Sequence, residues 1–294
     1  MADLPLTEGR AAQRHALDKL SPAELARAFE QANREATDAV AAIREPLARA
    51  IELTAEALAR GGRLVLAGAG TSGRLAVLEA AECGPTFRTD QVLGVIAGGQ
   101  GALLQAREGA EDDRADGAAA ARALEPVPAD VFLGVAASGR TPWVLGLLQA
   151  AREAGARVGL LSCAPPPEGQ ALDLRLVLPT GPELLSGSTR LKAGTATKCA
   201  LNALTTGAMA RLGKVMDDLM VDVAPTTDKL RARARRIVAE LVPTDEPRAG
   251  ALLEESAWEV KTAVVAGRLG LGPAAARARL AGAGGHLRRC LEAP

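Results

Sequence analysis

The sequence is poor in aromatic residues and in histidine. Among 294 residues there are three Phe, two Trp and no Tyr, and 35 Lys and Arg balance 35 Asp and Glu. Nucleic-acid-binding proteins typically carry a basic surface with aromatic side chains on which bases stack, so this composition argues against a nucleic-acid partner. The two histidines, His15 and His286, lie near the ends. This placement argues against a histidine-based metal site or a Ser-His-Asp triad in the centre of the chain.

Long apolar segments are also missing. The longest stretch without a charged residue covers 91–106, which is shorter than the roughly 20 apolar residues of a membrane-spanning helix. No apolar signal-peptide core follows the N-terminus. The four cysteines (Cys83, Cys163, Cys199 and Cys290) are scattered and form no CxxC pair. We therefore expect a cytoplasmic protein with free thiols and no membrane contact.

The centre of the chain alternates short apolar segments with helical patterns. Because these segments are rich in Val, Leu and Ile and do not alternate with polar residues, both faces of the sheet should be covered, as in parallel sheets. The predicted strands are 63–68, 92–97, 131–137, 157–163 and 174–179, and the predicted helices are 74–83, 102–116, 142–154 and 192–213. Strand–helix repetition predicts an α/β fold with a doubly wound, flavodoxin-like parallel sheet.

The two ends of the chain are predicted to be helical. Ser21-Pro22-Ala23-Glu24 has the pattern of a helix start, and Gly61-Gly62 ends the helical pattern that follows. After Pro225 the predicted helices are 226–241, one that begins at 244–247, 254–269, 273–281 and 287–291. We expect an N-terminal helical segment (1–50), a central α/β domain (51–223) and a C-terminal helical domain (224–294).

The first loop that could bind a ligand covers residues 68–74, GAGTSGR, between a strand and a helix. Backbone amides and the helix dipole favour an anion at such a helix start. The loop also matches G-x-G-x-x-G, but the second strand ends in Ala97-Gly98-Gly99-Gln100, without the carboxylate that a dinucleotide site requires. Thr71 and Ser72, together with Gly73, fit a terminal phosphate better, while a dinucleotide and a purely structural turn remain alternatives.

The second loop covers residues 137–142, ASGRTP, and repeats the strand-to-helix arrangement. The Ser138 and Thr141 hydroxyls and the Gly139 amide can converge on one anion. The alternative is simple capping of the helix by Ser or Thr before Pro. Two such loops in neighbouring crossovers favour a shared phosphate site, because both lie at the carboxyl edge of the sheet.

The third loop covers residues 181–192, GPELLSGSTRLK, before the long helix predicted at 192–213. Its hydroxyl and basic side chains, Ser188, Thr189 and Lys192 among them, could form a wall of the site. The alternative is a capped helix start with a surface lysine. The helix itself is apolar on nearly all sides, which is typical of a buried helix, at a subunit interface or within the chain.

Two carboxylates, Glu82 and Glu111, are candidate acid–base groups. Gly84-Pro85 predicts the end of a helix just after Glu82, and a carboxylate at a helix C-terminus lies in negative potential that favours its protonated form. Such a group suits a general acid. Glu111 lies in the acidic cluster 108–113, where like charges favour protonation of one member. For both residues the alternative is a solvated surface carboxylate.

Together these residues resemble the N-acetylmuramic acid 6-phosphate etherases, which have a sugar isomerase (SIS) domain. The resemblance covers most of the chain and implies an SIS-type parallel sheet. The matching stretches occur in the family's order: GAGTSGRLAVLEAAECGPTF (68–87), IAGGQGALLQAREGAEDD (96–113), AASGRTPW (136–143), GPELLSGSTRLKAGTATK (181–198) and LMVDV (219–223).

The resemblance implies a cytoplasmic homodimer that uses no metal or organic cofactor. The implied reaction cleaves the D-lactyl ether of N-acetylmuramic acid 6-phosphate by elimination and hydration, giving N-acetylglucosamine 6-phosphate and D-lactate. The family's two functional glutamates fall on Glu82, in the role of the acid at the departing oxygen, and on Glu111, which would handle the C2 proton. The first two loops would hold the phosphate.

Three other functions compete with the etherase. An aldose–ketose isomerase of the same fold would share the phosphate loops and an open-chain substrate. A sugar-phosphate sensor without catalysis could use the helical ends as docking surfaces, although the two glutamates argue against it. A nicotinamide dehydrogenase is disfavoured by the missing ribose carboxylate.

Overall fold

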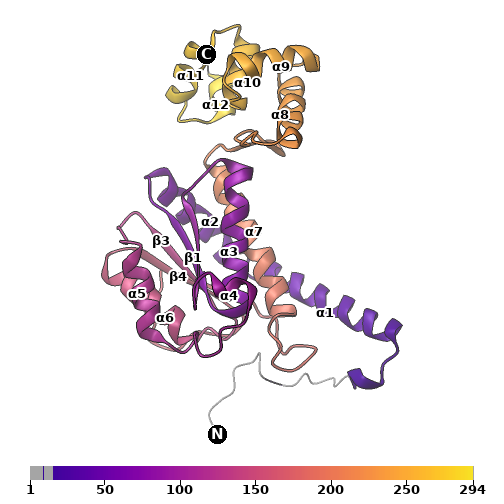
Figure 1. Cartoon of the computed structure of the whole chain (residues 1–294), viewed down its shortest axis with the longest axis vertical. Coiled ribbons are helices and arrows are strands. Elements are labelled where there is room, and N and C mark those ends of the chain that lie inside the picture. Colours follow the sequence, from indigo (N-terminus) through magenta and orange to yellow (C-terminus); the bar gives the residue numbers. More distant parts are fainter. Residues whose placement is uncertain (1–8, 10–15, 294) are drawn as a thin grey trace. The chain divides into compact units, whose positions relative to one another are not determined.

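The computed structural model describes residue 9 and residues 16–293, so the stretches 1–8 and 10–15 of the predicted N-terminal helical segment, with His15, lie outside the described residues. The chain divides into two compact units. The first comprises Met1–Ala81 and Gln91–Thr205, and the second comprises Glu82–Asp90 and Thr206–Pro294. Two helices, α3 and α7, begin in the first unit and end in the second (Figure 1).

The first unit is built on a parallel sheet of five strands in the order β2-β1-β3-β4-β5. The strands are β1 (Leu64–Gly68), β2 (Val92–Ile96), β3 (Val131–Val135), β4 (Arg157–Ser162) and β5 (Leu174–Val177). Leu64 of β1 is in register with Val92 of β2 and Val131 of β3. The flavodoxin-like sheet is therefore confirmed. Since the strand order reverses between β1 and β3, ligands are expected at the carboxyl ends of these two strands.

Burial on both faces explains why the strands lack polar alternation. All five residues of β1 and of β3 are buried. On one face, Val65, Phe132 and Leu160 pack with Trp143 and Leu147 of α6 (Pro142–Glu153) in one core cluster. At roughly 25 cal/mol per Å² of apolar surface, each such side chain contributes about 1.5–3 kcal/mol on burial. This core fixes the loops that follow the strands.

Helices cover both sides of this sheet. Figure 1 shows α5 (Arg114–Ala123) and α6 on one side, and α2 (Arg44–Ala59), α3 (Gly70–Phe87) and α7 (Lys192–Arg211) on the other. Eight of the twelve residues of α6 are buried. The part of α7 in the first unit is also mostly buried within this single chain, including Ala196, Ala200 and Leu204, so intrachain packing accounts for much of its apolar character.

The N-terminal helices begin where the sequence predicts. A short 3-10 helix, η2 (Leu17–Lys19), precedes α1 (Pro22–Ala42). Ser21 and Glu24 form a reciprocal capping box, in which the Ser21 amide donates to the Glu24 carboxylate at 2.8 Å. Only three alanines of α1 are buried in the described part of the chain, all in its second half.

The helix predicted at 102–116 is wrong. The structure has a single turn, α4 (Gly101–Leu104), then an irregular segment, and α5 only from Arg114. Gly109 has φ +76°, a conformation outside the right-handed helix. Asp113 caps α5 by accepting a hydrogen bond from the Asp116 amide at 2.9 Å. The acidic segment containing Glu111 is consequently a loop and not a helix face.

The second unit is helical apart from one small hairpin. Strands β6 (Val215–Met216) and β7 (Leu219–Met220) pair antiparallel. The helices are α8 (Asp228–Leu241), α9 (Glu246–Glu255), α10 (Val260–Leu269), α11 (Pro273–Gly282) and α12 (Leu287–Glu292), around a core that includes Ile237, Leu253 and Val264. The predicted helix 254–269 is wrong at its start, because Ala257 and Trp258 have positive φ and separate α9 from α10. No helix among the described residues is long and apolar enough to cross a membrane.

Candidate functional site

The loop after β1 opens α3 at the point where the strand order reverses. Helix α3 begins at Gly70, and the Gly73 amide donates to the carbonyl of Ala69, just before the helix, at 3.1 Å. Amides earlier in a helix have no carbonyl four residues back, so they are available to an anion. Gly73 is needed for packing, because a Cβ there would lie 2.5 Å from the Gly68 carbonyl oxygen. Thr71 and Ser72 are half-buried.

The loop after β3 forms a tight turn in front of α6. Gly139 has φ +70°, which permits the turn. Its amide donates to the Ala136 carbonyl at 2.9 Å, so this amide is already engaged within the chain and is not held out to a ligand as the sequence suggested. Ser138 accepts a hydrogen bond from the Arg140 amide at 3.2 Å. Thr141 precedes α6, but its side chain makes no capping bond, which leaves its hydroxyl for a ligand.

These two loops line one open cavity. Its lining brings together four predicted site residues, Thr71, Ser72, Ser138 and Thr141, with Thr189 from the third loop and with Glu111. The cavity encloses about 1160 Å³, open solvent included. Arg140 and Asp112 also line it, and neither was among the predicted site residues. Arg140 could have been found, because it is the one cation inside the ASGRTP loop.

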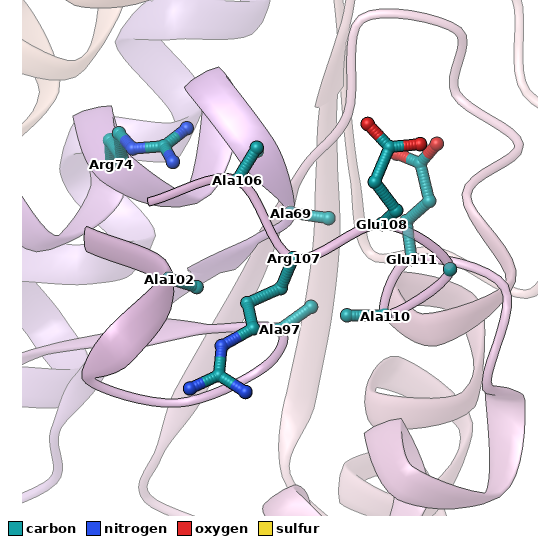
Figure 2. Close-up of a pocket in the computed structure, with 11 residues that line it drawn as sticks. Ala69, Arg74, Ala97, Ala102, Ala106, Arg107, Glu108, Ala110 and Glu111 are labelled. Atoms are coloured by element: carbon teal, nitrogen blue, oxygen red, sulfur yellow. The ribbon is translucent and has the colours of Figure 1, made fainter. Parts of the chain in front are cut away.

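A backbone hydrogen bond of Glu111 connects it to the start of α6, just after the second loop. The amide of Trp143, the second residue of α6, donates to the Glu111 carbonyl at 2.9 Å. The Trp143 indole nitrogen donates to Asp116 at 2.7 Å, which fastens the start of α5 to the same residue. Trp143 is itself 1% exposed. The Glu111 side chain is exposed and lines both this cavity and a neighbouring one (Figure 2).

Glu82 lies inside α3 and not at its end, so the predicted helix end at Gly84-Pro85 is wrong. Helix α3 runs to Phe87 with Pro85 inside it. A proline removes one donor, but the next turn still forms, because the Arg88 amide donates to the Gly84 carbonyl at 2.8 Å. The helix ends where Arg88 takes φ +48°. The exposed Glu82 side chain therefore lies before the last turn of α3. The negative potential at a helix C-terminus acts mainly within the last turn, so it does not single out Glu82.

Two of the predicted residues of the third loop, Thr189 and Lys192, line different cavities. Thr189 lines the cavity with the phosphate loops, and the half-buried Ser188 forms a turn through its amide to Leu185 at 3.0 Å. Lys192 instead lines a different cavity beside α1, where its ammonium group pairs with Glu35 at 2.7 Å. The buried Glu183, which the sequence analysis did not single out, caps α7 by accepting from the Lys192 and Ala193 amides, each at 2.9 Å.

Comparison with curated proteins shows close relatives over nearly the whole length. The chain is 50% identical over 291 residues to the N-acetylmuramic acid 6-phosphate etherase of Synechococcus elongatus, covering 98% of this chain and 95% of that protein. It is 48% identical over 293 residues to the etherase of Synechocystis sp., with 98% and 95% covered. The Cutibacterium acnes etherase is 45% identical over 295 residues, with 99% and 97% covered.

Two further comparisons concern the α/β part. Residues 46–152 match the family model described as the glucokinase regulatory protein N-terminal SIS domain. A solved structure of a putative phosphosugar isomerase involved in capsule formation from Bacteroides fragilis aligns with a TM-score of 0.49 at 19% identity, covering 66% of this chain and 94% of that chain.

Proposed function

The chain belongs to the N-acetylmuramic acid 6-phosphate etherase family, and from this premise we propose how its residues carry out the reaction. The protein is a carbon–oxygen lyase with etherase activity. The substrate is N-acetylmuramic acid 6-phosphate, which becomes N-acetylglucosamine 6-phosphate and D-lactate. The observation that carries the proposal is the single cavity in which the hydroxyls of two strand-to-helix loops meet Glu111.

The phosphate binds at the reversal of strand order. The open first turn of α3 supplies amides, and Thr71, Ser72, Ser138 and Thr141 supply hydroxyl donors. Hydrogen bonds from such groups to a charged acceptor are worth about 1.5–3 kcal/mol each. Arg140 on the cavity rim adds a cation. This end of the substrate provides affinity and orientation, while the ether bond reacts at the other end.

The chemistry is an elimination followed by hydration. In the open-chain aldehyde the carbonyl acidifies the C2 proton, which Glu111 removes. The electron pair of the C2–H bond forms the C2–C3 double bond, the C3–O bond breaks, and Glu82 protonates the departing oxygen to give D-lactate. Water then adds its oxygen at C3 and a proton at C2. The two roles come from the family resemblance, and each positioned acid or base typically contributes about 10²–10⁴-fold.

We propose that this protein works as a homodimer in the cytoplasm, in amino sugar catabolism and the recycling of cell-wall sugars. A sugar phosphate is charged and does not cross a bilayer freely, so the reaction belongs where the sugar is phosphorylated. The first half of α1 is exposed, and Phe29 in it is 39% exposed. This exposed helix face supports the proposal, because a second copy of the chain could pack against it. Light scattering at micromolar concentration tests the dimer, and a monomeric mass contradicts it.

An assay with the pure protein tests the function. N-acetylmuramic acid 6-phosphate should release stoichiometric D-lactate, and Glu82→Gln and Glu111→Gln should each lower the rate at least a hundredfold. The exposed Glu240→Gln on α8 serves as the matched control and should retain full rate. Absence of D-lactate with the wild-type protein across the pH range would overturn the proposal. Conversion of fructose 6-phosphate without ether cleavage would instead identify an isomerase.

A further inference from the structure

One buried carboxylate of the first unit has no role in the proposed reaction. Glu79 lies in α3 and is 4% exposed. A buried carboxylate is costly unless hydrogen bonds and an opposite charge compensate it. Both oxygens of Glu79 are bound by α7: the Lys198 ammonium donates to Oε2 at 2.7 Å, and the Thr205 hydroxyl donates to Oε1 at 2.5 Å. Glu79 therefore joins α3 to a helix whose bound lysine is 119 positions away in sequence.

The two groups of α7 that bind Glu79 are themselves held in place. Lys198 and Thr205 are two helical turns apart, so they lie on one face of α7. The Lys198 ammonium also donates to the side-chain oxygen of Asn202, which lies between them. Thr205 is 1% exposed. Because hydrogen bonds are directional and apolar contacts are not, these bonds determine how far α3 is shifted along α7.

The same two helices meet again at the phosphate cavity. The Thr71 methyl group, in the first turn of α3, lies beside Gly194 in the first turn of α7, where a Cβ would be 3.6 Å from it. The Gly194 amide donates to the Thr189 carbonyl at 3.0 Å, which ties Thr189 to the start of α7. Thr71 and Thr189 both line the phosphate cavity. One residue of its wall is thus carried by α3 and another is bound to α7.

The contacts occur in the same order along both helices. Thr71 lies beside Gly194, and Glu79, further along α3, is bound by Lys198 and Thr205, further along α7. Within the first unit, α3 and α7 therefore run side by side in the same direction (Figure 1). Thr71 and Glu79 are about 12 Å apart along α3. Hydrogen-bonded turns of helix connect them, so a shift of α3 along α7 at Glu79 also displaces Thr71.

We propose that Glu79 and Lys198, together with Thr205, are positioning residues for phosphate binding. The inference rests on the proposed function, in which Thr71 and its neighbours bind the phosphate, and adds the residues that hold the two walls of that site in alignment. A donor must lie at about 2.7–3.2 Å from a phosphate oxygen. A shift of α3 by about 1 Å therefore removes hydrogen bonds from one wall of the cavity while the fold persists.

The first test measures the Kd of the product N-acetylglucosamine 6-phosphate by calorimetry. Lys198→Gln should raise this Kd about tenfold, because Glu79 loses its ion pair and the alignment of α3 is no longer fixed. Lys198→Arg, which keeps the charge, should recover part of the affinity. The matched control is Arg152→Gln, because Arg152 pairs with Asp173 at 3.3 Å in the same unit but at the surface. This control should bind like the wild type.

A second variant separates positioning from stability. Glu79→Leu combined with Lys198→Met replaces the pair by apolar side chains, a change that often leaves stability equal or higher. Its melting temperature should therefore not fall below that of the wild type, whereas its Kd for the sugar phosphate should still rise about tenfold. Wild-type affinity in this variant would show that the pair only stabilises the fold and would overturn the proposal.

A double-mutant cycle shows whether the pair acts through Thr71. Thr71→Val removes a hydroxyl from the cavity and should raise the Kd about tenfold in the otherwise wild-type protein. In the Lys198→Gln background the same change should raise it less than threefold, because the displaced hydroxyl no longer reaches the phosphate. Substitutions at distant sites without a shared partner normally combine additively. Equal effects of Thr71→Val in the two backgrounds would overturn the proposal.

The result for the wild-type protein distinguishes this inference from the proposed function. An unchanged Kd in Lys198→Gln and in the apolar double variant would overturn the positioning role, while wild-type binding and D-lactate release stay intact. A wild-type protein that neither binds N-acetylglucosamine 6-phosphate nor releases D-lactate from the substrate would overturn the proposed function and this inference together.

Discussion

The ammonium group of Lys214 donates a 2.9 Å hydrogen bond to the carbonyl of Phe87, the last residue of α3. The same ammonium lies 3.5 Å from Asp222, which in turn pairs with Lys261 at 2.7 Å. The Ala224 amide adds a bond to the Pro85 carbonyl at 3.3 Å. These contacts satisfy carbonyls at the end of the helix on which Glu82 lies one turn earlier.

Lys214 is therefore expected to be a positioning residue for Glu82. Lys214→Gln should lower kcat by about ten- to a hundredfold with little change in KM, because the last turn of α3 loses its anchor and small displacements of an acid are costly. Lys214→Arg should recover part of kcat. The exposed Lys229→Gln on α8 is the control. A lower melting temperature with unchanged kcat would show a purely structural role.

The phosphate loops should act on binding more than on turnover. Ser72→Ala and Ser138→Ala each remove a hydroxyl from the cavity, and the loss of about 1.5–3 kcal/mol corresponds to a rise in KM of about ten- to a hundredfold. We expect kcat to change less than threefold in steady-state assays. Thr226→Ala, at an exposed position in the second unit, should have no effect. A drop in kcat at constant KM would place these serines at the reacting atoms instead.

Sequence patterns predicted the sheet well, because each strand is a short apolar segment between turns, and the central strands β1 and β3 are buried on both faces. They failed for 105–113, where Gly109 has a positive φ and the Trp143 amide, far along the chain, donates to the Glu111 carbonyl. They also ended α3 too early, since Pro85 is accommodated inside the helix.

In the candidate site, too, the sequence predicted what topology determines and missed what depends on contacts between distant residues. Polar residues directly after β1 and β3 were found, because topology alone brings the ends of neighbouring parallel strands together. The partner of Lys192, in contrast, is Glu35, which is 157 positions away in sequence. No local pattern distinguishes a lysine that binds a ligand from one that pairs with a distant helix.

Asp130 should contribute to stability in a pH-dependent way. Its side chain is fully buried and accepts hydrogen bonds from the Arg63 amide at 2.8 Å and from the Arg63 guanidinium at 2.6 Å. Burial alone would raise the pKa of Asp130, but the hydrogen bonds from Arg63 and Val127 outweigh it and hold the pKa below the usual 3.8. The stabilisation is therefore complete above about pH 4 and is lost as pH falls through the lowered pKa.

Urea unfolding as a function of pH measures this contribution. Asp130→Asn should lower the free energy of unfolding by about 1–3 kcal/mol at pH 7 and reduce its loss in acid. Glu56→Gln removes a solvent-exposed partner of Arg60 and should have almost no effect. An Asp130→Asn variant as stable as the wild type at pH 7 would contradict the account.

Cys163 should be inert in the folded protein. Burial raises the pKa of the Cys163 thiol to about 11. Little thiolate exists at pH 8, so iodoacetamide should leave Cys163 unmodified and should label the half-exposed Cys199 first. Peptide mapping by mass spectrometry gives the order, and labelling in urea is the control. Rapid labelling of Cys163 in native protein would contradict this assignment.

The fate of the solvent oxygen tests elimination and hydration most directly. With the reaction run in H₂¹⁸O and D₂O, mass spectrometry and NMR should find ¹⁸O at C3 of the N-acetylglucosamine 6-phosphate, deuterium at C2, and D-lactate that retains its original ether oxygen. A D-lactate product carrying ¹⁸O, with no deuterium at C2, would mean that water attacks the lactyl carbon, and would contradict the account.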